Sequence, residues 1–111
     1  MSSTGAGENI IRKVSFIGGS VTLTNQRVMF ESDFYFIDGL RGSERQRGGN
    51  KKFPIQSVNQ IKVIKASGMG CMGLTSAPFI VIETSGSDYY ISIESKSVGE
   101  CNALVSDFHK M

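Results

Sequence analysis

The chain lacks tryptophan, and its 111 residues include only one histidine, two cysteines and two prolines. Cys71 and Cys101 have no further cysteine or histidine at ligand spacing, so the sequence predicts no metal site. The single histidine, His109, has no acid–base partner in its local sequence. No nucleophile elbow, carboxylate pair or phosphate-binding glycine loop is present either. We therefore expect neither enzyme activity nor a cofactor.

Long apolar runs and a strong charge of either sign are also missing. No run of about eighteen apolar residues could span a membrane, and the formal charge of +2 is too small to favour nucleic acid as a partner. Residues 1–8 lack the basic start and apolar centre of a secretion signal, and we expect them to form a disordered leader. The sequence thus predicts one soluble cytoplasmic domain over residues 9–111, with both cysteines reduced.

Alternation of apolar and polar residues is the main pattern that the sequence does contain. Residues 20–24 alternate in this way, which is typical of a half-buried strand. The polar break at 25–27 separates them from an apolar run, which predicts a hairpin. A strand over 9–18, with a tight reversal at Gly18-Gly19, precedes this hairpin. The later predicted elements are strands at 28–37 with a bend at Ser32-Asp33, a return to the sheet at 51–53, a short helical turn within 54–60, and strands at 61–65, 79–84 (buried on both faces) and 89–93.

The C-terminal segment changes its apolar period from two residues to three and four. This spacing predicts an amphipathic helix over 97–109, and Ser97 with Glu100 fits a capping box at its start. Twisted antiparallel strands curl towards a barrel with an open end, and we expect the helix to plug that end. The predicted fold class is mainly β, a barrel of six or seven antiparallel strands capped by one C-terminal α-helix. The apolar positions of the helix are Val98, Cys101, Leu104, Val105 and Phe108.

Short motifs follow one another in a fixed order along the chain. Gly7-Glu8 precedes the first strand, residues 53–58 read Phe-Pro-Ile-Gln-Ser-Val, and residues 80–93 form an apolar strand, a glycine turn and an aromatic strand. The hairpin carries a leucine-threonine-asparagine-x-arginine pattern and an apolar run, made by Leu23, Thr24, Asn25, Arg27, Val28, Met29 and Phe30. Together the motifs resemble the GRAM and pleckstrin-homology-like domain family over about residues 7–109.

This resemblance implies a pleckstrin-homology-like fold and a non-catalytic binding function. The implied ligand is an anionic membrane lipid, phosphoinositides among them, or a protein. It also implies a structural role for Arg27, whose guanidinium would satisfy backbone carbonyls of the turn, with a ligand-binding role as the second choice. In the lipid-binding members the loop between the first two strands carries basic residues that grip inositol phosphates. Residues 17–20 carry no charge here, and Arg12 and Lys13 point to opposite faces of their strand, so this grip is not expected.

Two glycine-rich segments are the candidate binding sites. Residues 38–50 predict a long loop with many cations, which suit phosphate groups, although charge runs also occur simply as solvated loops. Residues 67–73 carry Met69 and Met72, which would insert into a membrane or seat a partner peptide, or else fold back onto the barrel rim. The basic candidates are Arg41, Arg45, Arg47, Lys51 and Lys52.

Three functions follow, in order of preference. The first is an adaptor, peripheral at membranes, that binds anionic phospholipid or a protein partner. The second is an interaction or self-assembly domain without a lipid ligand, in which an exposed strand edge within 28–37 pairs with another chain. The third is a small enzyme or ligand carrier with an apolar barrel interior, which the helical plug argues against.

Overall fold

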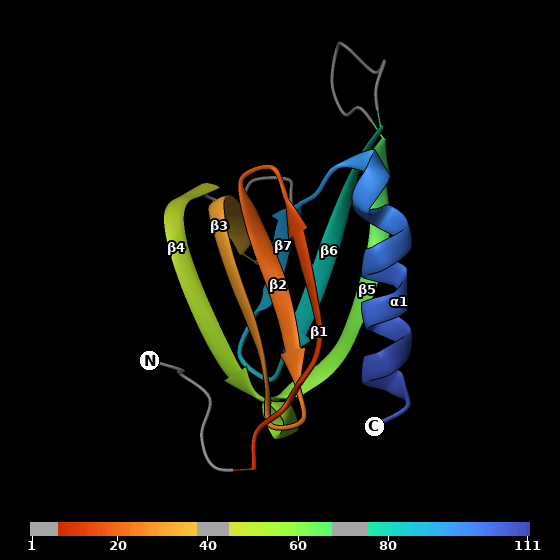
Figure 1. Ribbon diagram of the computed structural model, residues 1–111. Coiled ribbons are helices and arrows are strands. Elements are labelled where there is room, and N and C mark those ends of the chain that lie inside the picture. Colours follow the sequence, from red (N-terminus) through yellow and green to blue (C-terminus); the bar gives the residue numbers. More distant parts are fainter. Residues whose placement is uncertain (1–6, 38–44, 68–75) are drawn as a thin grey trace.

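The computed structural model describes residues 7–37, 45–67 and 76–111, which form seven strands and one C-terminal α-helix (Figure 1). All the paired strands are antiparallel. The mainly β class with a C-terminal helix is therefore confirmed. The elements are β1 (Ile10–Phe16), β2 (Gly19–Thr24), β3 (Arg27–Ile37), β4 (Arg45–Pro54), η1 (Ile55–Ser57), β5 (Val58–Ser67), β6 (Ser76–Thr84), β7 (Asp88–Ser92), η2 (Ser95–Ser97) and α1 (Val98–His109).

The first three strands form the predicted meander, with one face in the core. Val14 on β1 lies opposite Val21 on β2, which lies opposite Phe30 on β3, and all three are buried. Gly18 makes the β1–β2 turn with a φ of +94°, in the left-handed region that favours glycine. A side chain at Gly19 would collide with the backbone carbonyl of Glu31, so this turn requires both glycines.

Strand β3 joins the two halves of the sheet. Its first half pairs with β2, whereas residues 35–37 pair with β7, so that the strand order is β1-β2-β3-β7-β6-β5. The buried face of β3 changes along the way. Phe30 and Ser32 are buried in the first half, and Tyr35 is buried in the second. The strand is continuous across the predicted bend at Ser32-Asp33, and its inward face switches there instead.

Strand β4 corrects the prediction of a loop over residues 38–50. Residues 38–44 lie outside the described residues, but β4 already begins at Arg45 and pairs with β3 from Phe36↔Arg45 to Arg27↔Pro54. Glycine and charged residues have low strand propensity, and a full ladder of backbone hydrogen bonds overrides that propensity here.

The predicted barrel is not closed, and α1 does not plug an end of it. Among the described residues β1 pairs only with β2, and β5 only with β6. Helix α1 packs along both of these edge strands, on the right in Figure 1, with Cys101 and Leu104 fully buried. Its apolar stripe therefore covers the core along one side of the sheet, where no strand completes the ring.

The helix begins and ends close to its predicted bounds, but the predicted capping box is absent. The side chain of Ser97 makes no capping hydrogen bond, because the preceding turn η2 already holds this residue at helical angles (φ −92°, ψ −7°). Arg12 Nε on β1 donates to Asp107 Oδ2 on α1 at 2.6 Å, which ties the helix to the sheet. Within the described part of the chain, no helix has the length and apolar content needed to cross a bilayer.

Candidate functional site

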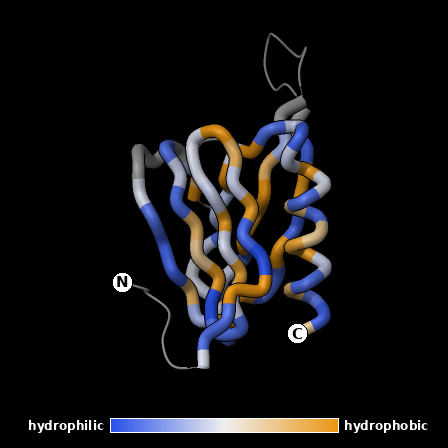
Figure 2. The backbone as a smooth tube through the Cα atoms, viewed as in Figure 1, coloured by the Kyte–Doolittle hydropathy of each residue, from blue (hydrophilic) through white to orange (hydrophobic). Residues whose placement is uncertain are grey.

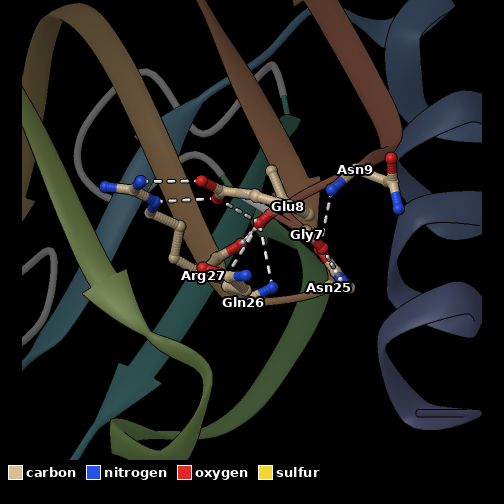
Figure 3. A network of polar contacts seen from close by, with 7 residues as sticks. Gly7, Glu8, Asn9, Asn25, Gln26 and Arg27 are labelled. Carbon is tan, nitrogen blue, oxygen red and sulfur yellow. Dashed lines mark hydrogen bonds and ion pairs between the residues drawn. The ribbon is translucent and has the colours of Figure 1, made fainter. Parts of the chain in front are cut away.

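The residues of the recognisable motifs meet in one polar network at the β2–β3 turn (Figure 3). The Glu8 side chain is fully buried, and its two oxygens accept hydrogen bonds from Arg27 Nε at 2.8 Å and from the terminal NH2 group at 2.7 Å. The Thr24 hydroxyl lies 2.7 Å from the same carboxylate and accepts from the backbone N–H groups of Gln26 and Arg27. This clamp fixes the turn to the start of the chain.

Asn25 completes the clamp from the other side of the turn. Its side-chain amide donates to the carbonyl of Gly7 and accepts from the N–H of Asn9, each at 2.8 Å. Gly7 has a φ of +79°, which favours glycine at this position. Gly7 and Glu8 thus belong to the folded part of the chain, whereas residues 1–6 of the predicted leader lie outside the described residues.

Arg27 is structural, but its predicted partner was wrong. The guanidinium binds the Glu8 carboxylate rather than backbone carbonyls, and the hydrogen bond to Glu8 raises the pKa of Arg27. The two charges therefore pair with each other inside this network. The Gly-Glu opening and the arginine of the hairpin motif are therefore two halves of one ion pair.

A basic groove of about 280 Å³ is the candidate binding site. It lies on the sheet of β1–β4, and the cations Lys13, Lys51 and Lys52 line it together with one acidic residue, Glu31. We call this site the lysine groove. The remaining lining residues are Ser20, Thr22, Met29, Phe30 and Asn50.

The sheet register explains how the lysine groove forms. Lys13 lies opposite Thr22, Thr22 opposite Met29, and Met29 opposite Lys52, which makes one row across four strands. Arg12, the neighbour of Lys13, is tied to α1, so the prediction that these two residues face opposite sides is confirmed. Lys13 was not a predicted site residue. Its place on the polar face of a strand, one tight turn from Thr22, is the signal that could have identified it.

The predicted basic residues have different outcomes. Lys51 and Lys52 lie in the lysine groove, half-buried and exposed respectively. Arg45 and Arg47 belong to the same strand, β4, at the positions opposite Phe36 and Phe34. Arg41, Met69 and Met72 lie outside the described residues, and so does Cys71.

A second hollow, of about 410 Å³, lies between the β1–β2 turn and the start of α1. Glu94 accepts a hydrogen bond from the backbone N–H of Ile17 at 2.6 Å, and Lys96 lies 3.5 Å from the other oxygen of Glu94. Glu100 also lines this hollow. Two acidic side chains against one basic side chain make it a poorer match for an anion than the lysine groove.

The described residues offer no group of three or more His, Cys, Asp and Glu side chains that could hold a metal ion. Cys101 is a buried free thiol. Its pKa is raised to about 11, mainly by burial and to a smaller extent by the negative charge of Glu100. A thiol of this kind stays protonated and unreactive at neutral pH. His109 is exposed at the end of α1, where its Nε2 lies 3.1 Å from the carbonyl of Ile61.

No family model, no curated protein and no solved structure matches the chain. The resemblance to GRAM and pleckstrin-homology-like domains therefore stays a prediction, and the function has to be argued from the geometry of the sheet.

Proposed function

We propose that the protein is a non-catalytic binding module, of the kind that GRAM and pleckstrin-homology-like domains represent, and that the lysine groove contacts an anionic membrane surface. The observation that carries this function is the row that places Lys13 of β1 and Lys52 of β4 at one hollow, which Lys51 and the acidic residue Glu31 also line. Lysine ammonium groups beside a polar hollow suit phosphate oxygens, because lysine binds them as a point charge. Bound in this way, the module acts as an adaptor that holds an attached partner at the membrane.

The expected affinity is modest. Each basic residue near an anionic surface contributes about 1 kcal/mol, so the three lysines supply about 3 kcal/mol together. Because these contacts are made at the surface, salt will screen them over a Debye length of about 8 Å at physiological ionic strength. Reversible, salt-sensitive membrane association follows.

Vesicle co-sedimentation tests this function. We expect binding to vesicles that contain phosphatidylserine or a phosphoinositide at low salt, weaker binding at physiological salt, and none to neutral phosphatidylcholine. Replacing Lys13 and Lys52 by alanine together should weaken binding about 25-fold, since each lysine accounts for roughly fivefold. Lys65→Ala is the matched control, because Lys65 is an exposed lysine on β5 that does not line the groove. Absence of binding to both anionic vesicles at low salt would exclude the membrane function.

A further inference from the structure

Strand β4 has one edge without a partner in the described structure. It pairs with β3 alone, and it lies at the side of the sheet opposite α1 (Figure 1). The other two edge strands, β1 and β5, each pack beside α1. The prediction of an exposed edge within residues 28–37 was wrong, because β3 pairs with β4 on one side and with β2 and β7 on the other. The N–H and C=O groups of β4 that point away from β3 form what we call the free edge.

The charge of β4 decides what kind of chain fits this edge. The strand carries Arg45, Arg47, Lys51 and Lys52 and no acidic residue, and Figure 2 shows its described part as mainly hydrophilic. Pairing with a second copy of β4 would bring two strands of the same positive charge together, and such repulsion destabilises a sheet most where like charges lie directly opposite each other. Acidic residues at the same positions would stabilise it. A strand from another protein with acidic side chains is therefore favoured over self-assembly.

We propose that the free edge of β4 takes up an extended acidic segment of a partner protein as an additional strand. Main-chain hydrogen bonds would supply affinity, and the pockets beside alternate side chains would supply specificity. This interaction shares Lys51 and Lys52 with the membrane function, but it also needs the backbone groups of the free edge, which membrane contact does not use.

Two hollows flank β4 where the side chains of an added strand would lie. Lys51 and Lys52 line the lysine groove. A different hollow, of about 350 Å³, is lined by Gln26, Arg27, Lys52, Phe53 and Pro54. Lys52 belongs to both. Since successive side chains of a strand alternate between faces, an acidic residue would meet Lys52, and an apolar residue would pack beside half-buried Phe53.

The strand also shows where addition must stop. Pro54 has no backbone N–H, so it cannot donate to a neighbouring strand at that position. Gly49 to Phe53 is therefore the longest described stretch with complete backbone groups and described side chains. A competing explanation is that the cations of β4 only protect the edge against aggregation, as lysines on edge strands commonly do. Binding measurements separate the two.

Hydrogen exchange of the full chain with a synthetic peptide tests strand addition. The probe is a peptide in which glutamate alternates with valine, and its matched control carries proline at alternate valines and keeps the same charge. We expect the glutamate–valine peptide to slow exchange about tenfold or more at alternate residues of Gly49–Phe53, because only outward-pointing amides gain a bond. The proline control should leave exchange unchanged. No slowing, or equal slowing by both peptides, would overturn the inference.

Substitutions provide the second test. Lys51→Glu with Lys52→Glu should weaken binding of the acidic peptide about tenfold or more, since opposite-charge pairs become like-charge pairs. Lys65→Ala should leave it unchanged, because Lys65 is exposed on β5 and lines neither hollow. Lys13→Ala should weaken vesicle binding, whereas proline in the free edge should not, so failure of one function leaves the other testable.

Proline placed at Gly49 or at Asn50 tests the backbone itself. These neighbours direct their N–H groups to opposite edges of β4, so one of the two variants keeps its ladder to β3 intact. We expect the variant that still unfolds cooperatively to have lost peptide binding. Full peptide binding by that folded variant would show that the free edge is not the site.

Discussion

At the scale of single residues, the Glu8–Arg27 pair explains why separated motifs occur together in this chain. Glu8 contributes a carboxylate whose side chain is fully buried, and Arg27 is 30% exposed. A carboxylate that is shielded from solvent needs hydrogen bonds from protein groups in place of water, and Arg27 and Thr24 supply them. The two residues are nineteen positions apart in the sequence. The residues next to Glu8 therefore do not explain why position 8 is acidic, and those next to Arg27 do not explain why position 27 is basic.

We predict an asymmetric response when the two ends of this pair are removed separately. Arg27→Met removes the charge that Arg27 places beside a fully buried carboxylate, which costs roughly 3–5 kcal/mol. Glu8→Gln leaves a guanidinium that reaches water, so the cost is closer to that of lost hydrogen bonds, about 1–3 kcal/mol. The free energy of unfolding in urea measures both.

Lys110→Met is the control, because it removes a cation from the exposed end of α1 and should change stability by less than about 0.5 kcal/mol. Equal losses for Arg27→Met and Glu8→Gln would contradict the asymmetry that burial of Glu8 requires.

At the scale of elements, what the sequence predicts correctly depends on how local the signal is. The bounds of α1 follow from an apolar period and the tight β1–β2 turn from Gly18-Gly19, and both are local. The start of β4 is not predictable in this way, since Arg-Gln-Arg-Gly-Gly has the composition of a loop and becomes a strand through pairing with distant β3. One of the three lysines of the groove, Lys13, was not predicted for the same reason, because Lys13 and Lys52 come together only through the register of four strands.

The contact between β1 and α1 yields a prediction at this scale. Arg12 and Asp107 lie 2.6 Å apart, with side chains 40% and 24% exposed. Partial exposure limits such a pair to roughly 0.5–1 kcal/mol. A double-mutant cycle with alanine at both positions, measured by urea unfolding, should give a coupling energy in this range that decreases at high salt.

The Lys96–Glu94 pair is the control for this cycle. Its atoms are 3.5 Å apart, and the Lys96 side chain is 81% exposed, so its coupling energy should be close to zero. If the two pairs coupled equally, or if salt left the Arg12–Asp107 coupling unchanged, the ion pair would not be what fastens α1 to β1.

At the scale of the whole molecule, the sequence predicts the order of the strands and the helix, but it does not predict whether the sheet closes into a barrel. An amphipathic helix after an antiparallel sheet indicates that the apolar face of the helix covers the core, and α1 does so. Its place along β1 and β5 depends on two facts that lie beyond any local pattern. Residues 35–37 pair with β7, and the inward face of β3 switches after Ser32. Together these leave the sheet open on the side that α1 occupies, and they place β4 on the other side.

This arrangement predicts which side of the molecule meets a membrane. Asn50 lines the lysine groove and Asn102 is exposed on α1, so Asn50→Cys and Asn102→Cys place an environment-sensitive fluorophore on opposite sides in a Cys71→Ser background. Cys101 stays unlabelled at neutral pH, since it is buried and its pKa is about 11. On vesicles with phosphatidylserine, the fluorophore at position 50 should shift to shorter wavelength and lose access to an aqueous quencher, while that at position 102 keeps its emission in water. A shift at position 102 alone would mean that α1, and not the sheet of β1–β4, faces the lipid.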